Sequence, residues 1–228
     1  MSVAKTNSSI PCTSSTPGVD NPELYASTEF WQQFHESFHN HEANIHELAE
    51  WIQPAMISLH QQLLKNTEYK KTLSRAKNDK ITGSDLAIPI FLTDYIQVKL
   101  ISIEAKHSLP LHDHPGAAGS IFVISGDVHI TEFESTDLSD STITFVDNKL
   151  IPVGKTRCFT QLQHNIHSLA APKNRVVIMS VHTPPFAVNS QSFYFPLINQ
   201  QQQNIGTQIN TQRVHTQAIQ HFRNNNSK

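Results

Sequence analysis

The spacing of apolar residues along the chain changes from helical to strand-like near residue 85. Before that point, apolar residues recur every three or four positions, as on one face of a helix: Phe30, Phe34, Phe38, Ile45, Leu48 and Ile52. Ser27 or Thr28 can cap this helix, and Pro54 is expected to break it or to open the next one. We therefore predict that residues 27–84 form a helical region.

After this region the sequence predicts short strands separated by turns. The stretches "YIQVKLISIEA", "GSIFVISGDVHITEFE" and "RVVIMSVHTPPF" are rich in β-branched and aromatic residues, and they alternate or run apolar. Because no helical pattern separates them, a barrel or sandwich fits better than a parallel sheet with crossover helices. The predicted β domain covers residues 85–196.

Both ends of the chain are polar. Residues 1–26 are rich in Ser, Thr, Pro and Asn and are predicted to form a flexible arm, and residues 197–228 to form a mobile Gln/Asn-rich tail. The N-terminus lacks the apolar stretch of a secretory signal, and no apolar run is long enough to predict a membrane span. We expect a cytoplasmic protein.

The composition argues against several classes of partner. The net charge is -2 and the pI is about 6.7, which does not favour nucleic acid or an anionic membrane. The two cysteines, Cys12 and Cys158, lie far apart and form no C-x-x-C pattern. We therefore expect no disulfide framework.

The chain contains 14 histidines, so a pair of them needs a structural reason to count as a metal site. His35 and His39 lie four residues apart on the predicted helix and could share an ion on one face. They lack the Glu that follows the first His in the usual zinc-protease helix. We interpret them as part of a solvated helix face.

His112 and His114 lie where a strand is expected, in "LPLHDHPG". Residues i and i+2 of a strand project to the same face, so these two imidazoles can converge on one ion. A third ligand is expected from another strand, because metal sites that carry out chemistry typically use three protein ligands. His164 and His167 are the candidates for it.

The string "PLHDHPG", followed about 50 residues later by "NIH" and then by "SVHTPPF", resembles the cupins. Within the cupins it is most similar to the thiol dioxygenases, which include cysteine dioxygenase, cysteamine dioxygenase and the plant cysteine oxidases. The first cupin motif has a Glu where this chain has Ala118 or Gly119, and a closing glycine that Gly126 matches. The thiol dioxygenases also lack this Glu and hold iron with three histidines.

The resemblance implies a mainly β fold, a cupin double-stranded β-helix or jelly-roll barrel with an N-terminal helical region. It also implies that His112, His114 and His167 are the ligands of an Fe(II) cofactor. The string "NIH" favours His167 over His164. Iron itself follows from the family, because imidazole binds several divalent metals.

A second part of the resemblance concerns catalytic residues. Cysteine dioxygenase has a Ser-x-His-x-Tyr string before a Pro-Pro, in which Ser and His support an active-site tyrosine. Ser180 and His182 match it, but Thr183 alone separates His182 from Pro184, so the tyrosine is missing. Animal cysteine dioxygenases also join this tyrosine to a cysteine, whose position here is Gly119. We therefore expect Ser180 and His182 to be catalytic and no crosslink to form.

Three neutral ligands leave the ion with its full charge, which favours binding of a thiolate near neutral pH. The leading hypothesis is an iron-dependent dioxygenase that adds O2 to the sulfur of a small thiol and gives a sulfinic acid. The alternatives are another three-His cupin oxygenase and a non-catalytic cupin that binds a small ligand. The sequence specifies neither the thiol nor the oligomeric state.

The charge of the substrate is the last expectation. A carboxylated thiol needs a cation in the pocket, for which arginine is best suited. No arginine lies between Arg75 and Arg157, and "FLTDYIQVKLISIEA" offers only Lys99. Arg175 has the wrong strand parity to point inward. Arg157 and Lys99 stay as candidate partners for a carboxylate, but no motif supports either. We therefore expect a thiol without a carboxylate, such as an aminothiol.

Overall fold

The computed structural model describes residues 28–81, 85–135, 142–161, 163–185, 192–196 and 208–215. The predicted N-terminal arm lies outside these residues. The helices are α1 (Thr28–His41), α2 (Ile45–Leu63) and α3 (Thr67–Asn78). The strands are β1 (Asp85–Leu92), β2 (Gln97–Ile103), β3 (Ser108–His112), β4 (Ala118–Ser125), β5 (Val128–Glu134), β6 (Thr142–Ile151), β7 (Thr156–Phe159), β8 (Ile166–Ala170), β9 (Val176–Thr183), β10 (Ser192–Pro196) and β11 (Gln208–His215). Within the described residues every helix is too short or too polar to cross a membrane.

Two antiparallel sheets form the β domain. The first has the strand order β1-β2-β9-β4-β7, and the second, β10-β11-β6-β5-β8-β3, closes on itself. Alternate side chains of both sheets meet in one buried cluster, in which Ile121 and Ile178 of the first sheet join Ile130 and Leu169 of the second. The structure confirms the predicted mainly β barrel with a preceding helical region.

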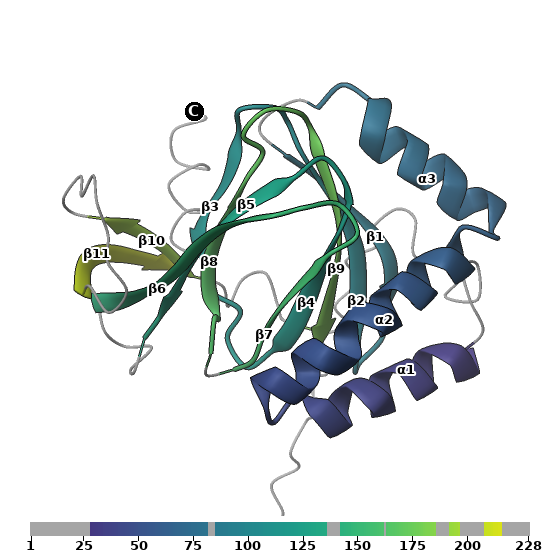
Figure 1. Cartoon of the computed structure of the whole chain (residues 1–228), viewed down its shortest axis with the longest axis horizontal. Helices are drawn as coiled ribbons and strands as arrows, with labels where there is room; N and C mark the ends of the chain where they lie inside the picture. The colour runs from purple at the N-terminus through teal and green to yellow at the C-terminus, as the bar shows by residue number, and fades with distance from the viewer. Residues whose placement is uncertain are drawn as a thin grey trace, which may run out of the picture.

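The three helices lie against the first sheet (Figure 1). The residues that α2 buries recur at helical spacing: Leu48, Ile52, Met56, Leu59 and Leu63. They pack against the outward-facing residues of β9, which are Val177, Met179 and Val181. Every residue of β9 is buried, because its other face lies inside the barrel. Burial on both faces accounts for the continuous apolar run in this part of the sequence.

The helical region is divided differently from the sequence prediction. The first helix ends at His41, and α2 begins after Asn44, whose side chain accepts a hydrogen bond from His46 N at 2.9 Å. Pro54 lies inside α2 and neither breaks a helix nor opens one. Proline has no backbone N–H, so one helical hydrogen bond is lost at this exposed position. The packing of the buried face of α2 offsets that loss.

One side chain of α2 connects the helical layer to β7. Gln53 Nε2 donates to the carbonyl oxygen of Gly154 at 2.7 Å, and its Oε1 accepts from Thr156 N at 2.9 Å. Gln53 thus satisfies backbone groups at the start of β7, an edge strand of the first sheet. The same strand carries Arg157 and Phe159 into the barrel, so this contact helps to position them.

The second sheet continues past residue 196, where the sequence pattern ended the β domain. Strand β11 pairs with β10 and with β6, and Thr211 within it is 1 % exposed. Part of the Gln/Asn-rich segment therefore belongs to the sheet. The sequence did not predict β11 because this polar stretch shows no clear alternation of apolar and polar residues. Its pairing with β6 also depends on contact with a distant segment of the chain.

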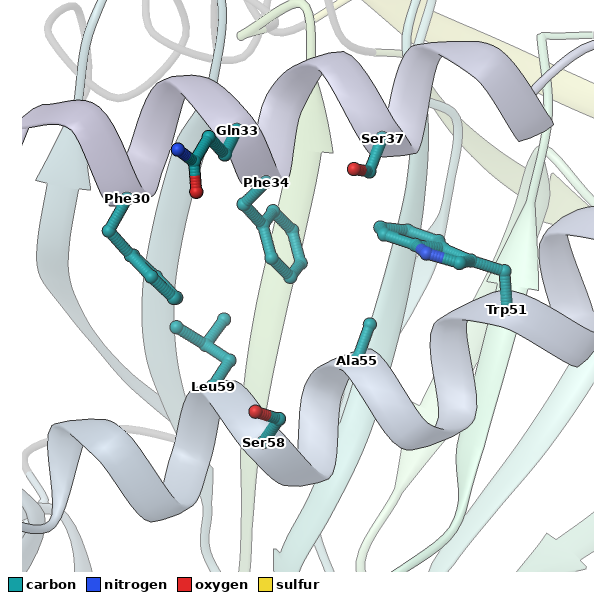
Figure 2. A pocket seen from close by; sticks show the side chains of 8 residues that line it. All are labelled: Phe30, Gln33, Phe34, Ser37, Trp51, Ala55, Ser58 and Leu59. Atoms are coloured by element: carbon teal, nitrogen blue, oxygen red, sulfur yellow. The ribbon is translucent and has the colours of Figure 1, made fainter.

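A pocket of about 210 Å³ lies between α1 and α2 (Figure 2). Its lining is mainly apolar and comes entirely from these two helices: Phe30, Gln33, Phe34, Ser37, Trp51, Ala55, Ser58 and Leu59. None of these side chains is titratable or a strong metal ligand. The chemistry that the histidine motifs imply must therefore be located elsewhere.

The position of Pro54 gives a prediction about stability. Replacing Pro54 with Ala should raise the free energy of unfolding by about 1–3 kcal/mol, because alanine restores the missing helical hydrogen bond and proline costs about 3 kcal/mol inside a helix. Urea unfolding measures the change. Ser58→Ala, also on the exposed side of α2, is the control and should shift the value by no more than about 0.5 kcal/mol. A less stable Pro54→Ala variant would contradict the prediction.

Candidate metal centre

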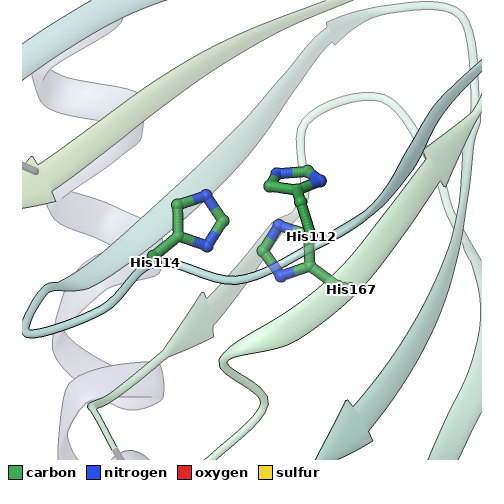
Figure 3. Close-up of side chains that lie close together, drawn as sticks. All are labelled: His112, His114 and His167. Carbon is green, nitrogen blue, oxygen red and sulfur yellow. The ribbon is translucent and has the colours of Figure 1, made fainter. Parts of the chain in front are cut away.

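Three buried histidines meet in the structure (Figure 3). His112 ends β3, His114 follows it, and His167 lies on β8 directly opposite His112 in the strand register. A nitrogen atom of each ring lies within 4.8 Å of the nitrogens of the other two. The rings come from two neighbouring strands and the loop after β3, and together they offer three nitrogen donors to one ion.

Backbone carbonyl groups orient two of the rings. The Nδ1 atom of His112 lies 2.7 Å from the carbonyl oxygen of Pro110, and that of His167 lies 3.4 Å from the carbonyl oxygen of His164. A histidine whose Nδ1–H donates in this way presents Nε2 to a metal. The arrangement suits metal ligation, most clearly at His112.

Asn165 connects the two segments that carry the histidines. Its Oδ1 accepts a hydrogen bond from His114 N at 3.0 Å, and its Nδ2 donates to the carbonyl oxygen of Gln161 at 3.1 Å. The side chain is buried. Asn165 is the first residue of the "NIH" string. The string was used to choose His167 as a ligand, and it predicted no structural role for the asparagine.

Burial keeps the three imidazoles neutral. Desolvation, reinforced by the neighbouring His167, lowers the pKa of His112 to about 3 and the pKa of His114 well below its usual value. Desolvation also lowers the pKa of His167, although the carboxylate of Glu132 opposes this shift. Neutral imidazole is the form that binds a metal. The donor set therefore fits a divalent ion without any proton having to leave.

His164, the other candidate for the third ligand, lies outside the three-His group. Its backbone is left-handed, with φ of 56°, and its ring turns away toward two charged side chains. The Nδ1 atom lies 3.5 Å from Glu132 Oε2 and 3.4 Å from a guanidinium nitrogen of Arg157. The left-handed conformation separates the ring of His164 from its carbonyl group, which faces His167.

Ser180 and His182 lie on β9, in the first sheet. Their side chains are buried, and Ser180 Oγ lies 3.5 Å from His182 Nε2. The His182 ring stacks on His114, with centroids 4.9 Å apart. Desolvation, together with the charge of Lys99, lowers the pKa of His182 well below its usual value. The pair therefore adds a neutral polar wall beside the three-His group.

Lys99 is opposite Ser180 in the register of β2 with β9. Its neighbours on the same face of β2, Ile101 and Ile103, belong to the cluster inside the barrel. Burial lowers the pKa of Lys99 to about 8, so the ammonium group still predominates at neutral pH. Its charge acts on His112, His114 and His182.

Phe159 fills the space next to His114. The two rings stack with centroids 4.6 Å apart and an angle of 24° between their planes. A Cβ atom on Gly119 would lie only 2.4 Å from the Phe159 ring and 2.5 Å from the carbonyl oxygen of Val181. No side chain fits at position 119 without a shift of the backbone or of Phe159. A Glu side chain at position 119, one of the two positions where the cupin motif would place it, would therefore not fit in this structure.

Glu132 is a buried carboxylate that the sequence analysis missed. It lies on β5 opposite His167 on β8, and it is 1 % exposed. Arg157 donates to both of its oxygens, with Nε at 2.7 Å from Oε1. Burial opposes ionisation, yet the hydrogen bonds from His164 and Arg157 prevail and hold the pKa of Glu132 at about 2. Strand parity with Val128 and Ile130 was the available signal for an inward direction.

Asp113, the middle residue of His-Asp-His, anchors the motif through its contacts with Tyr194 and Arg213. Its side chain is fully buried and accepts a hydrogen bond from the Tyr194 hydroxyl at 2.9 Å. Arg213, on β11, lies 3.5 Å from the same carboxylate and over the ring of Tyr194. These contacts connect β10 and β11 to the loop that carries His114.

The helix histidines do not form a second site. The rings of His35 and His39 have centroids 6.2 Å apart, and His35 Nδ1 lies 3.1 Å from Thr183 Oγ1. Among the residues that the structure describes, the three-His group is the one cluster of His, Cys, Asp or Glu arranged to hold a metal.

Comparisons with solved structures give matches of low sequence identity and low TM-score. A Klebsiella pneumoniae protein with a double-stranded β-helix domain is 14% identical, covers 50% of this chain and 91% of its own, and has a TM-score of 0.40. An oxalate oxidase in complex with glycolate is also 14% identical and covers 50% of this chain and 60% of its own, with a TM-score of 0.39. No curated protein matches the sequence.

The family comparison is more specific. A model of the PCO_ADO family matches residues 48–226, which include most of the helical region and the whole β domain. The match extends beyond the "HDH", "NIH" and "SVH" strings on which the resemblance rested, and it confirms that resemblance. The chain belongs to the PCO_ADO family of thiol dioxygenases, which have the cupin fold.

Proposed function

We propose that this chain is an Fe(II)-dependent dioxygenase that converts a small thiol, RSH, and O2 into a sulfinic acid, RSO2H. Both oxygen atoms go to sulfur, which loses four electrons, and O2 gains four, so no other reductant is consumed. Family membership supports thiol dioxygenase activity. The observation that carries the proposal is the buried group of three histidines whose ring nitrogens converge.

His112, His114 and His167 are the proposed ligands. Bound iron would supply a dipositive centre that favours the thiolate form of the substrate and allows reaction with O2. The protein contributes the orientation of the rings, through the carbonyl groups of Pro110 and His164, and an environment from which water is largely excluded.

Ser180 and His182 are the proposed catalytic pair. They face the three-His group from the opposite sheet, and their hydrogen-bonding distance allows a proton to be shared between Oγ and Nε2. The tyrosine that such a pair supports in cysteine dioxygenase has no counterpart after His182. We infer that the pair contacts the substrate directly.

The expected cytoplasmic location stays a prediction.

A substrate without a carboxylate is the proposed class, with an aminothiol as its simplest member. Both guanidinium–carboxylate contacts of Arg157 are already made with Glu132. Arg175 binds Glu104 at 2.5 Å and the carbonyl oxygens at the end of α3. Lys99 is a further cation whose charge acts on His112 and His114, but an ammonium group gives no bidentate clamp for a carboxylate.

The first prediction from the proposed function concerns the ligands. Replacing His114 or His167 with Ala should weaken Fe(II) binding by more than about 100-fold, because losing a ligand costs more than losing its outer-shell partner. His164→Asn should retain one equivalent of metal, since asparagine tolerates a left-handed backbone. Metal analysis after dialysis measures the binding. If the His164 variant is the one that loses the metal, the assignment is wrong.

The second prediction is that no Cys–Tyr crosslink forms. Gly119 replaces the cysteine of that crosslink, and Cys158 faces the helices, with its Sγ 3.9 Å from the carbonyl oxygen of Ile45. Burial raises the pKa of Cys158 to about 11, so it is a poor nucleophile. Tryptic mass spectra before and after many turnovers should show Cys12 and Cys158 unlinked to any tyrosine, and product formation should show no lag. A crosslinked peptide would refute this.

The third prediction concerns substrate charge. Oxygen uptake should give a value of kcat/KM for cysteamine at least about tenfold above those for cysteine and 3-mercaptopropionate, since an unpaired buried carboxylate costs more than 1 kcal/mol. Detection of the sulfinic acid by mass spectrometry is the control that uptake reflects thiol oxidation. A clear preference for either carboxylated thiol would reject the proposed class and point to Lys99.

A further inference from the structure

Glu132 places a carboxylate next to the three-His group. Strand β8 lies between β3 and β5, so His167 has His112 as its register partner on one side and Glu132 on the other. Directly opposed residues on antiparallel strands share a face, with Cβ atoms about 4.5–5.5 Å apart. The Glu132 side chain is 1 % exposed. It therefore shares the interior of the barrel with His167.

Strand alternation sets this direction, and a β-bulge lies directly after Glu132. The register of β5 with β6 shifts between Glu132 and Phe133, and both residues are buried. Phe133 belongs to a separate apolar cluster that includes Tyr194, whereas Val128 and Ile130 belong to the cluster between the sheets. Glu132 continues the inward series of Val128 and Ile130. A bulge beside a functional site is a common means of directing one side chain.

Arg157 occupies both oxygens of this carboxylate. Its Nε donates to Oε1 at 2.7 Å, its second nitrogen donates to Oε2, and His164 Nδ1 lies 3.5 Å from Oε2. Arg157 is itself held by Asp147, with 3.6 Å between the charged atoms. Glu132 is not among the residues whose ligand atoms converge with those of the three histidines. Its oxygens are directed to the arginine.

We propose that Arg157 is a positioning residue that keeps Glu132 from becoming a fourth metal ligand. This inference rests on the proposed function. A carboxylate that entered the coordination sphere would reduce the charge of the centre by one and occupy a position that a thiolate needs. A dication in a buried site attracts a neighbouring carboxylate strongly, so a bidentate guanidinium is required to hold it back. In this proposal, the ion pair between Arg157 and Glu132 ensures that the metal has only the three histidines as protein ligands.

The test uses Co(II) as the probe, because its visible spectrum reports the number and type of its ligands. Arg157→Met should change the spectrum of the Co(II) protein and tighten Co(II) binding roughly tenfold, as Glu132 is released toward the ion. It should also weaken the thiolate-to-Co(II) band that cysteamine induces. Binding constants come from titration of the metal-free protein. The double variant Arg157→Met/Glu132→Gln should return the spectrum and the affinity to those of the unmodified protein.

Glu132→Gln alone is the matched control. It preserves the shape of the side chain, and the proposal requires an unchanged Co(II) spectrum. A changed spectrum would mean that Glu132 is already a ligand and would overturn the proposal. An unchanged spectrum and affinity in Arg157→Met would overturn it equally.

Arg157→Met leaves a buried carboxylate without its partner, which can prevent folding. Arg157→Lys is the second variant, because it keeps the charge but makes one contact where arginine makes two. It should shift the spectrum and the affinity in the same direction by a smaller amount, and circular dichroism checks the fold. An unchanged Co(II) spectrum in the folded Lys variant would count against the proposal. If the unmodified protein binds no Co(II), the proposed function fails; if it binds and the arginine variants match it, only this inference fails.

Discussion

The position of β8 between β3 and β5 is the constraint on which the candidate site depends. Because β8 pairs with both neighbours, His167 is fixed opposite His112 on one side and opposite Glu132 on the other. A slip of one residue would turn His167 out of the barrel and bring Ile166 or Ser168 to its place. The register therefore determines at once which imidazoles converge and which carboxylate lies beside them.

Strand β9 transmits the packing of the helices to the same site. Its outward residues, Val177, Met179 and Val181, contact the helical layer, while Ser180 and His182 point inward beside the three-His group. A strand buried on both faces has little freedom to change its register or tilt. The proposed catalytic residues do not come from the helices. The apolar contacts of the helices hold β9 in place, and β9 carries Ser180 and His182.

Local patterns in the sequence predicted what depends on local spacing. The strand series, the convergence of His112 and His114 and the inward direction of Ser180 and His182 follow from a period of two. The resemblance supplied the cupin fold and the choice of His167. Contacts between distant segments were out of reach: Tyr194 lies 81 positions from Asp113, and Glu132 is 25 from Arg157. Pro54 was misinterpreted because tertiary packing overrides a helix-breaking propensity.

Two separate features of the barrel have the same electrostatic consequence. At position 119, one of the two positions where the first cupin motif would place its Glu, the Phe159 ring and a backbone carbonyl leave no room for a side chain. At position 132, a carboxylate is present but both its oxygens face Arg157. The first excludes a negative charge by shape and the second by pairing, and the proposed ion is left with neutral ligands. In the proposed reaction the incoming thiolate would balance its positive charge, so neutral protein ligands would favour binding of that thiolate.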